Sequence, residues 1–229
     1  MQDTQAWDQW ATDRPGRRDT NAAGETTWFN WTIHPDHGPG AEVLGDIGPG
    51  TRVLELGCGS GGNLAHVAAL GADATGIDLS PVQVQAAKDR YPHLTVQTGT
   101  ASRFLATAPD RYHAVYSVYG ASWFTDPDDL LPLVLAALAP DGRYAFSQNP
   151  PALPGCVGPQ ATQMKPPTPG EPLYVKRWDY EPDEWESRLK EAGFVNVKAQ
   201  VITPPPGRRT GTLLVTGDKP PRDHTAMSS

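Results

Sequence analysis

The 229-residue sequence has few cysteines, no excess of basic charge and no long apolar run. Its two cysteines, Cys58 and Cys156, are too few for a disulfide framework, which favours a reducing, cytoplasmic location. No stretch of about 18 apolar residues is present, so we expect no membrane partner. The first ten residues are polar and carry Asp3 and Asp8, unlike the basic and then apolar start of a secretory signal.

The charge balance argues against nucleic acid as a partner. The chain has 26 acidic and 19 basic residues, a formal net charge of −7. Nucleic-acid-binding proteins usually present a basic field to phosphates. Here basic residues form only isolated pairs, such as Arg17-Arg18 and Arg208-Arg209. We therefore expect a small-molecule partner, and the oligomeric state, monomer or homodimer, stays open.

Short apolar runs after turns alternate with segments of helical spacing through the middle of the chain. The expected strands are 52–56, 74–77, 94–97, 114–118, 142–148, 195–203 and 210–216, and the expected helices are 63–70, 81–90, 101–108, 127–139 and 181–192. Such alternation predicts a parallel sheet with helices on both faces. The last two strands have no helix between them and should pair antiparallel. The expected fold is α/β, a Rossmann-like seven-stranded, mostly parallel sheet with a C-terminal antiparallel hairpin.

The remaining segments flank this pattern. Residues 1–40 form an N-terminal segment that can close as a lid, and 41–217 form the main domain. Within it, 149–178 is a Pro-rich insert on the substrate side, and its part 150–170 can form neither a helix nor a central strand. Residues 218–229 are expected to be a disordered tail.

A glycine loop at 57–62 follows the first strand and opens a helix. Glycine lets the backbone turn sharply and lets a ligand approach it closely. The helix N-terminus adds unpaired N–H groups and a partial positive charge. Asp78 ends the next strand about 20 residues after the loop, where a carboxylate can take both hydroxyls of a ribose. The two features predict a site for a nucleoside-containing cofactor.

The residue Glu55 separates two interpretations of this loop. The spacing Gly57-x-Gly59-x-x-Gly62 also fits the dinucleotide pattern. A carboxylate two residues before the loop would repel a pyrophosphate, but it would attract an ammonium group and a sulfonium. Glu55 and the final hairpin therefore disfavour an NAD-dependent oxidoreductase.

Five motifs carry a resemblance to a known family. They are VLELGCGSGG at 53–62, GIDLS at 76–80, YHAVYSVYG at 112–120, LAPDGRYAFS at 138–147 and LKEAGF at 189–194. Over about residues 40–217 the chain resembles the class I S-adenosylmethionine (SAM) dependent methyltransferases. The resemblance implies an enzyme that uses SAM as its methyl donor.

The resemblance also implies which residues hold the cofactor. The glycines Gly57, Gly59 and Gly61 would pass close to the methionine part of SAM. Glu55 would orient its ammonium group, and Asp78 would hold the ribose hydroxyls.

Further contacts are implied at the ends of the next strands. Leu79 would cover the adenine, and Ala101 and Ser102 would lie at its edge. Ser117 or Val118 would offer a carbonyl to the ammonium group.

The sequence departs from the family pattern in two places. Many relatives have an acidic residue in the loop after strand three, whereas segment 99–102 has none, so backbone or hydroxyl groups must read the adenine amino group. Many relatives have Asp where His113 stands, and we interpret His113 as structural because it lies far from the cofactor. Within the glycine loop, Cys58 touches the cofactor region as a small packing residue rather than a nucleophile.

The acceptor should sit beyond the carboxyl ends of the strands, as ligands do in open α/β sheets. Segments 28–40, 119–125 and 149–178 can roof this crevice. Their expected substrate-binding residues are Trp28, Trp31, His34, Tyr119, Trp123 and Trp178.

Methyl transfer requires the acceptor atom in line with the methyl group, at about 3–3.5 Å. A carboxylate or thiolate acceptor needs no base, whereas an amine or phenol must lose a proton. The candidate catalytic residues are His34 and Tyr119, although His34 fits an ordinary loop histidine equally well. His34, Asp36 and His37 have no further ligands grouped with them, so no metal is expected.

The sequence favours a SAM-dependent methyltransferase acting on an O or N atom of a small molecule. An alternative is a SAM-binding protein without methyl transfer, such as a cyclase or isomerase, because no base is evident. RNA or protein methylation ranks lower, since the residues 117–120 after strand four carry no Asn-Pro-Pro-Tyr motif.

Overall fold

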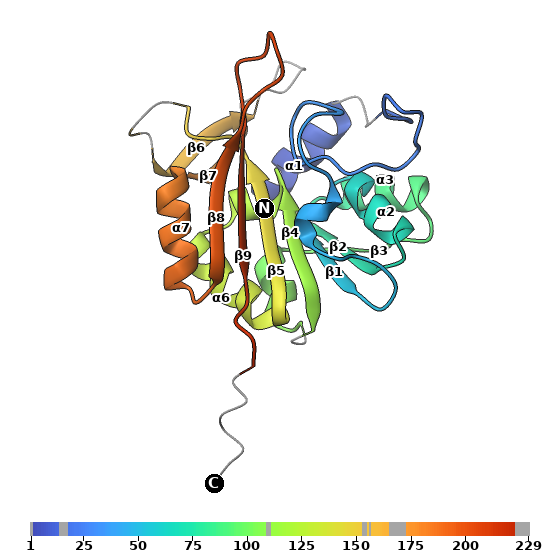
Figure 1. Cartoon of the computed structure of the whole chain (residues 1–229). Helices are drawn as coiled ribbons and strands as arrows, with labels where there is room; N and C mark the ends of the chain where they lie inside the picture. Colours follow the sequence, from blue (N-terminus) through green and yellow to red (C-terminus); the bar gives the residue numbers. More distant parts are fainter. Residues whose placement is uncertain are drawn as a thin grey trace.

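The centre of the molecule is a seven-stranded sheet, seen in the computed structural model in Figure 1. The structure describes residues 2–13, 18–108, 111–152, 155, 157–164 and 173–222. The strands of the sheet are β1 Arg52–Leu56, β2 Asp73–Asp78, β3 Thr95–Thr98, β4 Tyr112–Val118, β5 Leu138–Gln148, β8 Val195–Ile202 and β9 Thr212–Asp218. Their order is β3-β2-β1-β4-β5-β9-β8, with β1 to β5 parallel and β9 antiparallel to both neighbours. The expected fold class is confirmed.

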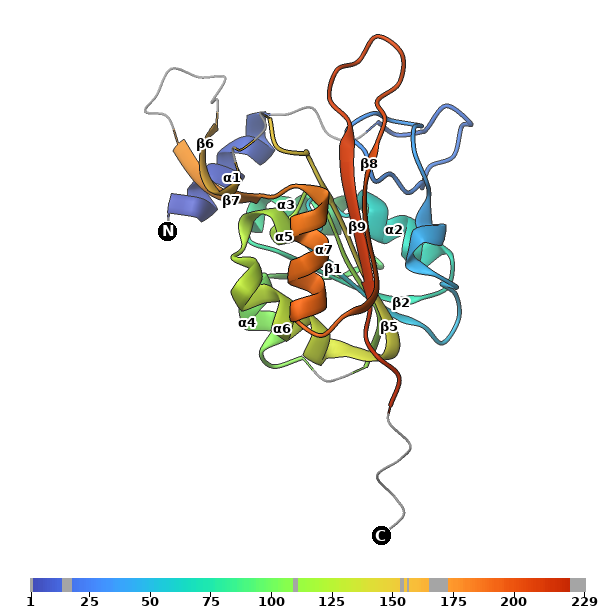
Figure 2. The same ribbon diagram turned by 60° about the vertical axis from the view of Figure 1, so that its left-hand side comes forward.

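Helices cover both faces of this sheet. They are α1 Gln2–Asp13, α2 Gly62–Ala69, α3 Pro81–Arg90, α4 Ala101–Leu105, α5 Ala121–Phe124, α6 Pro127–Ala137 and α7 Pro182–Glu191, with a 3-10 turn η1 at Ala41–Leu44. Figure 2 shows α4, α6 and α7 on one face and α2 on the other. The Ser80 hydroxyl caps α3 by accepting from the Gln83 N–H, and Pro81 occupies the first turn, as expected.

The alternation of side chains along each strand supplies a core to each face. Leu54 and Leu56 of β1 pack with the buried residues of α6 and α7. Val53, from the same strand, packs with α2 and α3 instead. In β4, Val115 and Tyr116 divide between the two cores in the same way. These buried strands read as continuous apolar runs because both faces are covered.

The Pro-rich insert forms a second, two-stranded sheet outside the main one. Strands β6 Gly158–Met164 and β7 Leu173–Asp179 pair antiparallel. In Figure 2 this hairpin lies beside α1, and β7 contacts that helix. The segment is thus absent from the central sheet, as its prolines indicate. Parts of the insert, including Cys156 and 165–172, lie outside the described residues.

Two segments differ from the expectations. The first residues, expected to be mobile or loosely helical because they are polar, form the regular helix α1. The expected tail begins inside β9, because Asp218 pairs with Arg143 at 2.8 Å and the Lys219 N–H donates to the Gly142 carbonyl. Residues 223–229 of that tail lie outside the described residues.

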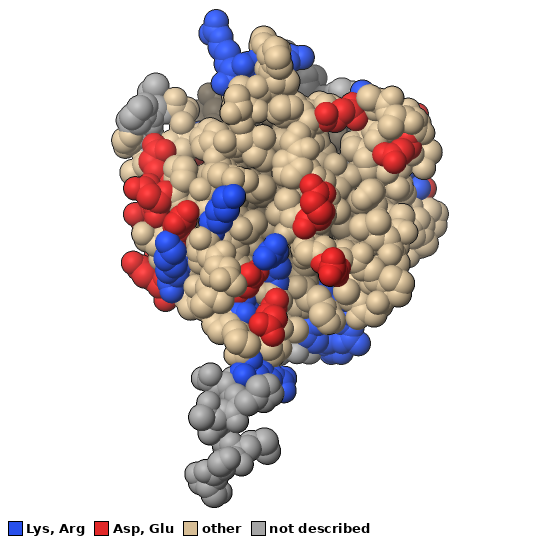
Figure 3. Space-filling view, in the orientation of Figure 1, with Lys and Arg blue, Asp and Glu red and all other residues tan. Residues whose placement is uncertain are grey.

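Charged side chains are mixed on the surface. In Figure 3, the face of Figure 1 shows Lys and Arg interspersed with Asp and Glu rather than gathered in one patch. Among the residues placed in the structure, no helix combines the length and apolar character needed to cross a bilayer.

Candidate functional site

The glycine loop and Asp78 meet at the carboxyl ends of β1 and β2. The Gly59 N–H donates to Asp78 Oδ2 at 2.8 Å, and the Ser80 N–H donates to Asp78 Oδ1 at 2.9 Å. The N–H groups of Gly57 and Cys58 both donate to the Ile77 carbonyl of β2, at 2.7 and 3.0 Å. The loop and the acid therefore form one wall at the same edge of the sheet.

Gly57 is required by close packing against the segment after β4. Its φ is +78°, in the left-handed region that favours glycine. A Cβ there would lie 2.5 Å from the Ala121 nitrogen and 2.8 Å from the Gly120 Cα. Gly59 has φ +52°, but the nearest atom to an added Cβ, Gln83 Oε1, would be 4.0 Å away. The backbone at Gly59 thus faces open space that a ligand can fill.

A cavity of about 700 Å³ opens in front of this wall. It lies at the switch point between β1 and β4, where ligands bind in open α/β sheets. Among the expected cofactor residues, its lining includes Glu55, Gly57, Cys58, Gly59, Asp78, Leu79, Ala101, Ser102 and Val118. The structure thus brings together residues from four strand ends that are far apart in the sequence.

Two expected cofactor residues lie outside the cavity lining. The Ser117 hydroxyl donates to the Leu56 carbonyl at 2.7 Å and accepts from the Ser122 N–H at 3.2 Å, so it ties β4 to its neighbours. Gly61 directly precedes α2 and has a φ of +77°. A Cβ added there would lie 3.2 Å from Leu94, in the loop between α3 and β3.

The carboxylates of the site are held by hydrogen bonds. Glu55 is buried, and the Tyr116 hydroxyl donates to its Oε2 at 3.0 Å. Burial raises the pKa of Asp78, and the nearby charge of Asp8 adds to this, while backbone N–H groups oppose it. Burial and the charges of Glu55 and Asp78 raise the pKa of the Cys58 thiol well above its usual value. A neutral, buried Cys58 thiol fits a packing residue.

Helix α1 supplies cavity walls through two residues that the sequence analysis did not single out. Trp7 and Trp10 line the cavity. The Trp7 ring lies edge-on to Phe124, with centroids 4.6 Å apart. The Asp8 carboxylate accepts a hydrogen bond from the Ser80 hydroxyl, beside Asp78. The tryptophans, three residues apart in a polar segment, were the available signal, because residues at that spacing share a helix face.

Two of the expected substrate residues, Tyr119 and Trp178, line the cavity. The Tyr119 hydroxyl lies 2.7 Å from the Thr212 hydroxyl. Burial raises the pKa of the Tyr119 phenol, which disfavours the phenolate that a base would need. Its backbone φ of +49° is unusual for a bulky residue, so the end of β4 holds it in a fixed position.

Three other expected substrate residues are not among those that line the cavity. Trp31 is fully buried under α2, and its indole N–H donates to a backbone carbonyl at 2.8 Å. The Trp123 indole donates to Asp179 Oδ1 at 2.8 Å. His34 Nε2 donates to the Thr210 carbonyl at 2.9 Å, in the loop between β8 and β9. The aromatic part of segment 28–40 therefore buries apolar area against α2, while its two histidines bond to the loop between β8 and β9.

His113 lies at the other end of the sheet. Its Nδ1 accepts from the Arg52 N–H at 2.9 Å, where β1 begins. This placement agrees with the structural role that the sequence indicated.

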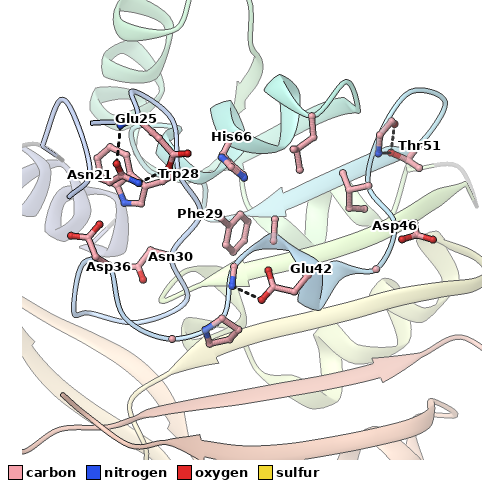
Figure 4. Close-up of a pocket in the computed structure, with 18 of the residues that line it drawn as sticks. Asn21, Glu25, Trp28, Phe29, Asn30, Asp36, Glu42, Asp46, Thr51 and His66 are labelled. Atoms are coloured by element: carbon pink, nitrogen blue, oxygen red, sulfur yellow. Dashed lines mark hydrogen bonds between the residues drawn. The ribbon is translucent and has the colours of Figure 1, made fainter. Parts of the chain in front are cut away.

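Trp28 lines a second cavity, of about 740 Å³, shown in Figure 4. The labelled carboxylates of Figure 4 come mainly from loops between residues 21 and 46. Two of them form hydrogen bonds within their own segments: Glu25 accepts from the Asn21 amide at 2.6 Å, and Glu42 accepts from the Gly40 N–H at 2.8 Å.

A pair of asparagines separates the two cavities. Asn30 lines the cavity of Figure 4, and Asn63, in the first turn of α2, lines the cavity at the glycine loop. The Asn30 N–H donates to Asn63 Oδ1 at 3.1 Å, and Asn63 Nδ2 donates to the Asn30 carbonyl at 3.2 Å. This reciprocal pair ties the N-terminal segment to the helix that follows the glycine loop.

Comparison with protein families agrees with this geometry. Residues 53–142 match a family model described as a methyltransferase domain. A trans-aconitate 2-methyltransferase of Methylobacterium radiotolerans is 34% identical over 113 residues, which cover 47% of this chain and 42% of that protein. One from Paracidovorax citrulli is 30% identical over 112 residues, covering 47% and 43%. The chain thus matches less than half the length of these relatives.

Solved structures share the fold. A SAM-dependent methyltransferase of Listeria monocytogenes superposes with a TM-score of 0.64 at 22% identity, covering 78% of this chain and 93% of that one. A phosphoethanolamine N-methyltransferase 2 of Haemonchus contortus, in complex with SAM, gives 0.60 at 17% identity, covering 78% and 51%. Segment 53–142, which contains the glycine loop and Asp78, thus matches a methyltransferase domain, and the chain shares the fold of SAM-dependent methyltransferases.

Proposed function

We propose that this protein binds SAM in the 700 Å³ cavity and transfers its methyl group to an O or N atom of a small molecule. The observation that carries the proposal is the direct contact between the glycine loop and Asp78, through the Gly59 N–H. The contact supports the proposal because the open backbone at Gly59 and the carboxylate of Asp78, which would bind the ribose, share one wall of one cavity.

The polar groups of the cavity suit a nucleoside with a cationic tail. Each Asp78 oxygen already accepts one backbone N–H, and each can accept another donor from a ribose hydroxyl. Glu55 places a buried negative charge at the other end of the loop, where an ammonium group would be stabilised.

The adenine would lie between Leu79 and the start of α4. Ala101 and Ser102 line that part of the cavity, and the Thr100 hydroxyl there caps α4 by accepting from the Arg103 N–H at 3.3 Å. Ser102 is thus the hydroxyl available to read the adenine edge, in place of the acidic residue of many relatives.

The residues 1–40 act in two parts in this proposal. Helix α1 is the lid, because Trp7 and Trp10 line the cavity and Asp8 holds the helix to Ser80. Segment 28–40 is a support beneath α2. A lid of this kind excludes water from the reacting centre.

SAM, when bound, supplies an activated methyl group, and the protein's own contribution is to hold the acceptor in line with it. No histidine is among the described residues that line the cavity. His34, one of the two base candidates, lies outside it, and Tyr119 shares its hydroxyl with Thr212. The chemistry therefore relies on positioning more than on proton transfer.

The lack of a histidine among the described lining residues also supports the alternative of a SAM-binding protein that transfers no methyl group. Calorimetry with S-adenosylhomocysteine (SAH), SAM and NAD tests the cofactor, and SAM carrying a labelled methyl group, with a metabolite panel, tests transfer. The panel should include trans-aconitate, because the curated relatives are named for it. We expect SAH to bind, NAD to fail and label to reach an acceptor. NAD binding without SAH binding would contradict the cofactor, and SAH binding without transfer across the panel would favour the alternative.

A further inference from the structure

Lys176, on β7, is the one cationic side chain among the described residues that line the 700 Å³ cavity. The two acidic groups, Glu55 and Asp78, lie on the side assigned to the cofactor. The walls that remain for the acceptor are mainly aromatic, from Trp7, Phe124 and Trp178 together with Trp10 and Tyr119. The acceptor side therefore combines an apolar surface with one positive charge.

The two neighbouring cations of β7, Lys176 and Arg177, differ in their ion pairs. Arg177 Nε lies 3.0 Å from Asp179 Oδ2, so its charge is compensated within β7. Lys176 forms no salt bridge to a carboxylate in the described part of the chain. Its Nζ lies 4.7 Å from the centre of the Trp178 ring, which lines the cavity. This cation–π contact holds the ammonium group at the cavity wall, available to an anion.

The cavity also lacks an obvious group to remove a proton, in the part of the chain that is described. Its lining contains no histidine, and the Tyr119 hydroxyl is bonded to Thr212. Burial, together with the charges of Glu55 and Asp78, raises the pKa of the Cys58 thiol well above its usual value, so it is not a base. An amine or alcohol acceptor needs a base for its proton, whereas a carboxylate reacts as it is.

We propose that the acceptor is a monocarboxylic acid with an apolar body, that Lys176 pairs with its carboxylate, and that a carboxylate oxygen takes the methyl group. This inference rests on the proposed methyl transfer from SAM. A lone pair of the oxygen forms the new O–CH3 bond while the methyl–sulfur bond breaks and leaves its electron pair on sulfur. The carboxylate and the sulfonium become a neutral ester and a thioether, and no proton is released. The aromatic walls would cover the apolar body and exclude water.

The test is binding to the full chain saturated with SAH, measured by calorimetry. The probes are benzoate, 3-phenylpropanoate, hexanoate and decanoate, each compared with its amide, with 3-phenylpropylamine and trans-aconitate added. We expect at least one monocarboxylate to bind tenfold or more tightly than its amide, and more tightly than the amine and the tricarboxylate.

Variants assign this preference to Lys176. Lys176→Gln should abolish it, and Lys176→Arg should retain part of it, because Arg keeps the charge. Lys198→Gln, which removes an exposed lysine of β8 outside the cavity lining, is the matched control and should leave the preference unchanged. With labelled SAM, the product label should be released by mild base, as expected for a methyl ester.

The inference is overturned if SAH binds but no monocarboxylate does, if the amides or the amine bind as tightly, or if Lys176→Gln keeps the preference. Base-stable label on the best acceptor would likewise overturn it. Failure of SAH to bind would instead remove the proposed function on which the inference rests.

Discussion

The two cavities of this protein have nearly the same volume, about 740 and 700 Å³, but they differ in how their polar groups are used. In the cavity of Figure 4, Glu25 and Glu42 are tied to their own loops, and Asp36 pairs with Arg18 at 2.7 Å. At the glycine loop, the carboxylate of Asp78 accepts backbone N–H groups at the carboxyl end of β2, beside residues that follow β1, β3 and β4. Size therefore does not identify the site, whereas its place at the carboxyl ends of the parallel strands does.

The largest contrast is expected between two glycines with positive φ, one from each cavity. Gly57→Ala forces a Cβ to within 2.5 Å of the Ala121 nitrogen, while Gly45→Ala meets no atom within 4 Å. Both place alanine at a positive φ, which costs about 1–3 kcal/mol, and Gly57→Ala adds an overpacking cost of about 1–3 kcal/mol. Urea unfolding followed by circular dichroism should show the larger loss for Gly57→Ala, together with loss of SAH binding. Equal losses for the two variants would contradict the packing argument.

The second contrast replaces one carboxylate in each cavity. Asp78→Asn should weaken SAH binding by about tenfold or more, the scale of a lost charge-assisted hydrogen bond. Asp36→Asn removes a surface ion pair with Arg18 and should leave SAH affinity unchanged. Calorimetry on both variants, with melting temperatures as a check on folding, measures the difference. Unchanged affinity in Asp78→Asn would count heavily against the assigned site.

The pH dependence sharpens the same comparison with a smaller effect, because lowering the pH neutralises the Asp78 carboxylate gradually, whereas Asp78→Asn removes its charge at every pH. Its raised pKa means that acidification neutralises it before an ordinary aspartate. Cofactor affinity should then fall as pH decreases through that raised pKa. The folded state without cofactor behaves oppositely: the contribution of Asp78 to stability is present at low pH and is lost as pH rises through the raised pKa. SAH titrations from neutral to mildly acidic pH should show the fall, and Asp78→Asn should flatten it.

The smallest effect is expected at the lid. Trp7→Ala removes a ring pair with Phe124, worth about 0.5–1.5 kcal/mol, and should weaken SAH binding by about threefold. Trp28→Phe, at the cavity of Figure 4, should leave the affinity unchanged. If Trp7→Ala binds SAH as tightly as the parent protein does, α1 covers the acceptor and not the cofactor.

The sheet and the cofactor wall could be predicted because each depends on local sequence. A short apolar run predicts the strand that ends at Leu56, and a Ser-Pro pair predicts the helix cap at Ser80. The glycine loop and Asp78 each follow a strand, and they lie at the same edge of the sheet because β1 and β2 are parallel neighbours.

The roof of the site could not be predicted in the same way. Trp31 and Trp7 are both tryptophans in irregular or polar segments, yet one fills the core under α2 and the other lines the cavity. Which of them buries more area depends on long-range packing that no spacing rule reports. The proposed role of Lys176 gave no signal either, since it depends on the lack of an ion pair like the one that Arg177 forms with Asp179.

The reciprocal amide contact of Asn30 and Asn63 has a thermodynamic consequence. Since one partner begins the helix after the glycine loop, any molecule that rigidifies this first turn also restrains the N-terminal segment, and protection from amide hydrogen exchange should rise in both. By reciprocity, loosening residues around position 30 should lower occupancy at a site they do not line.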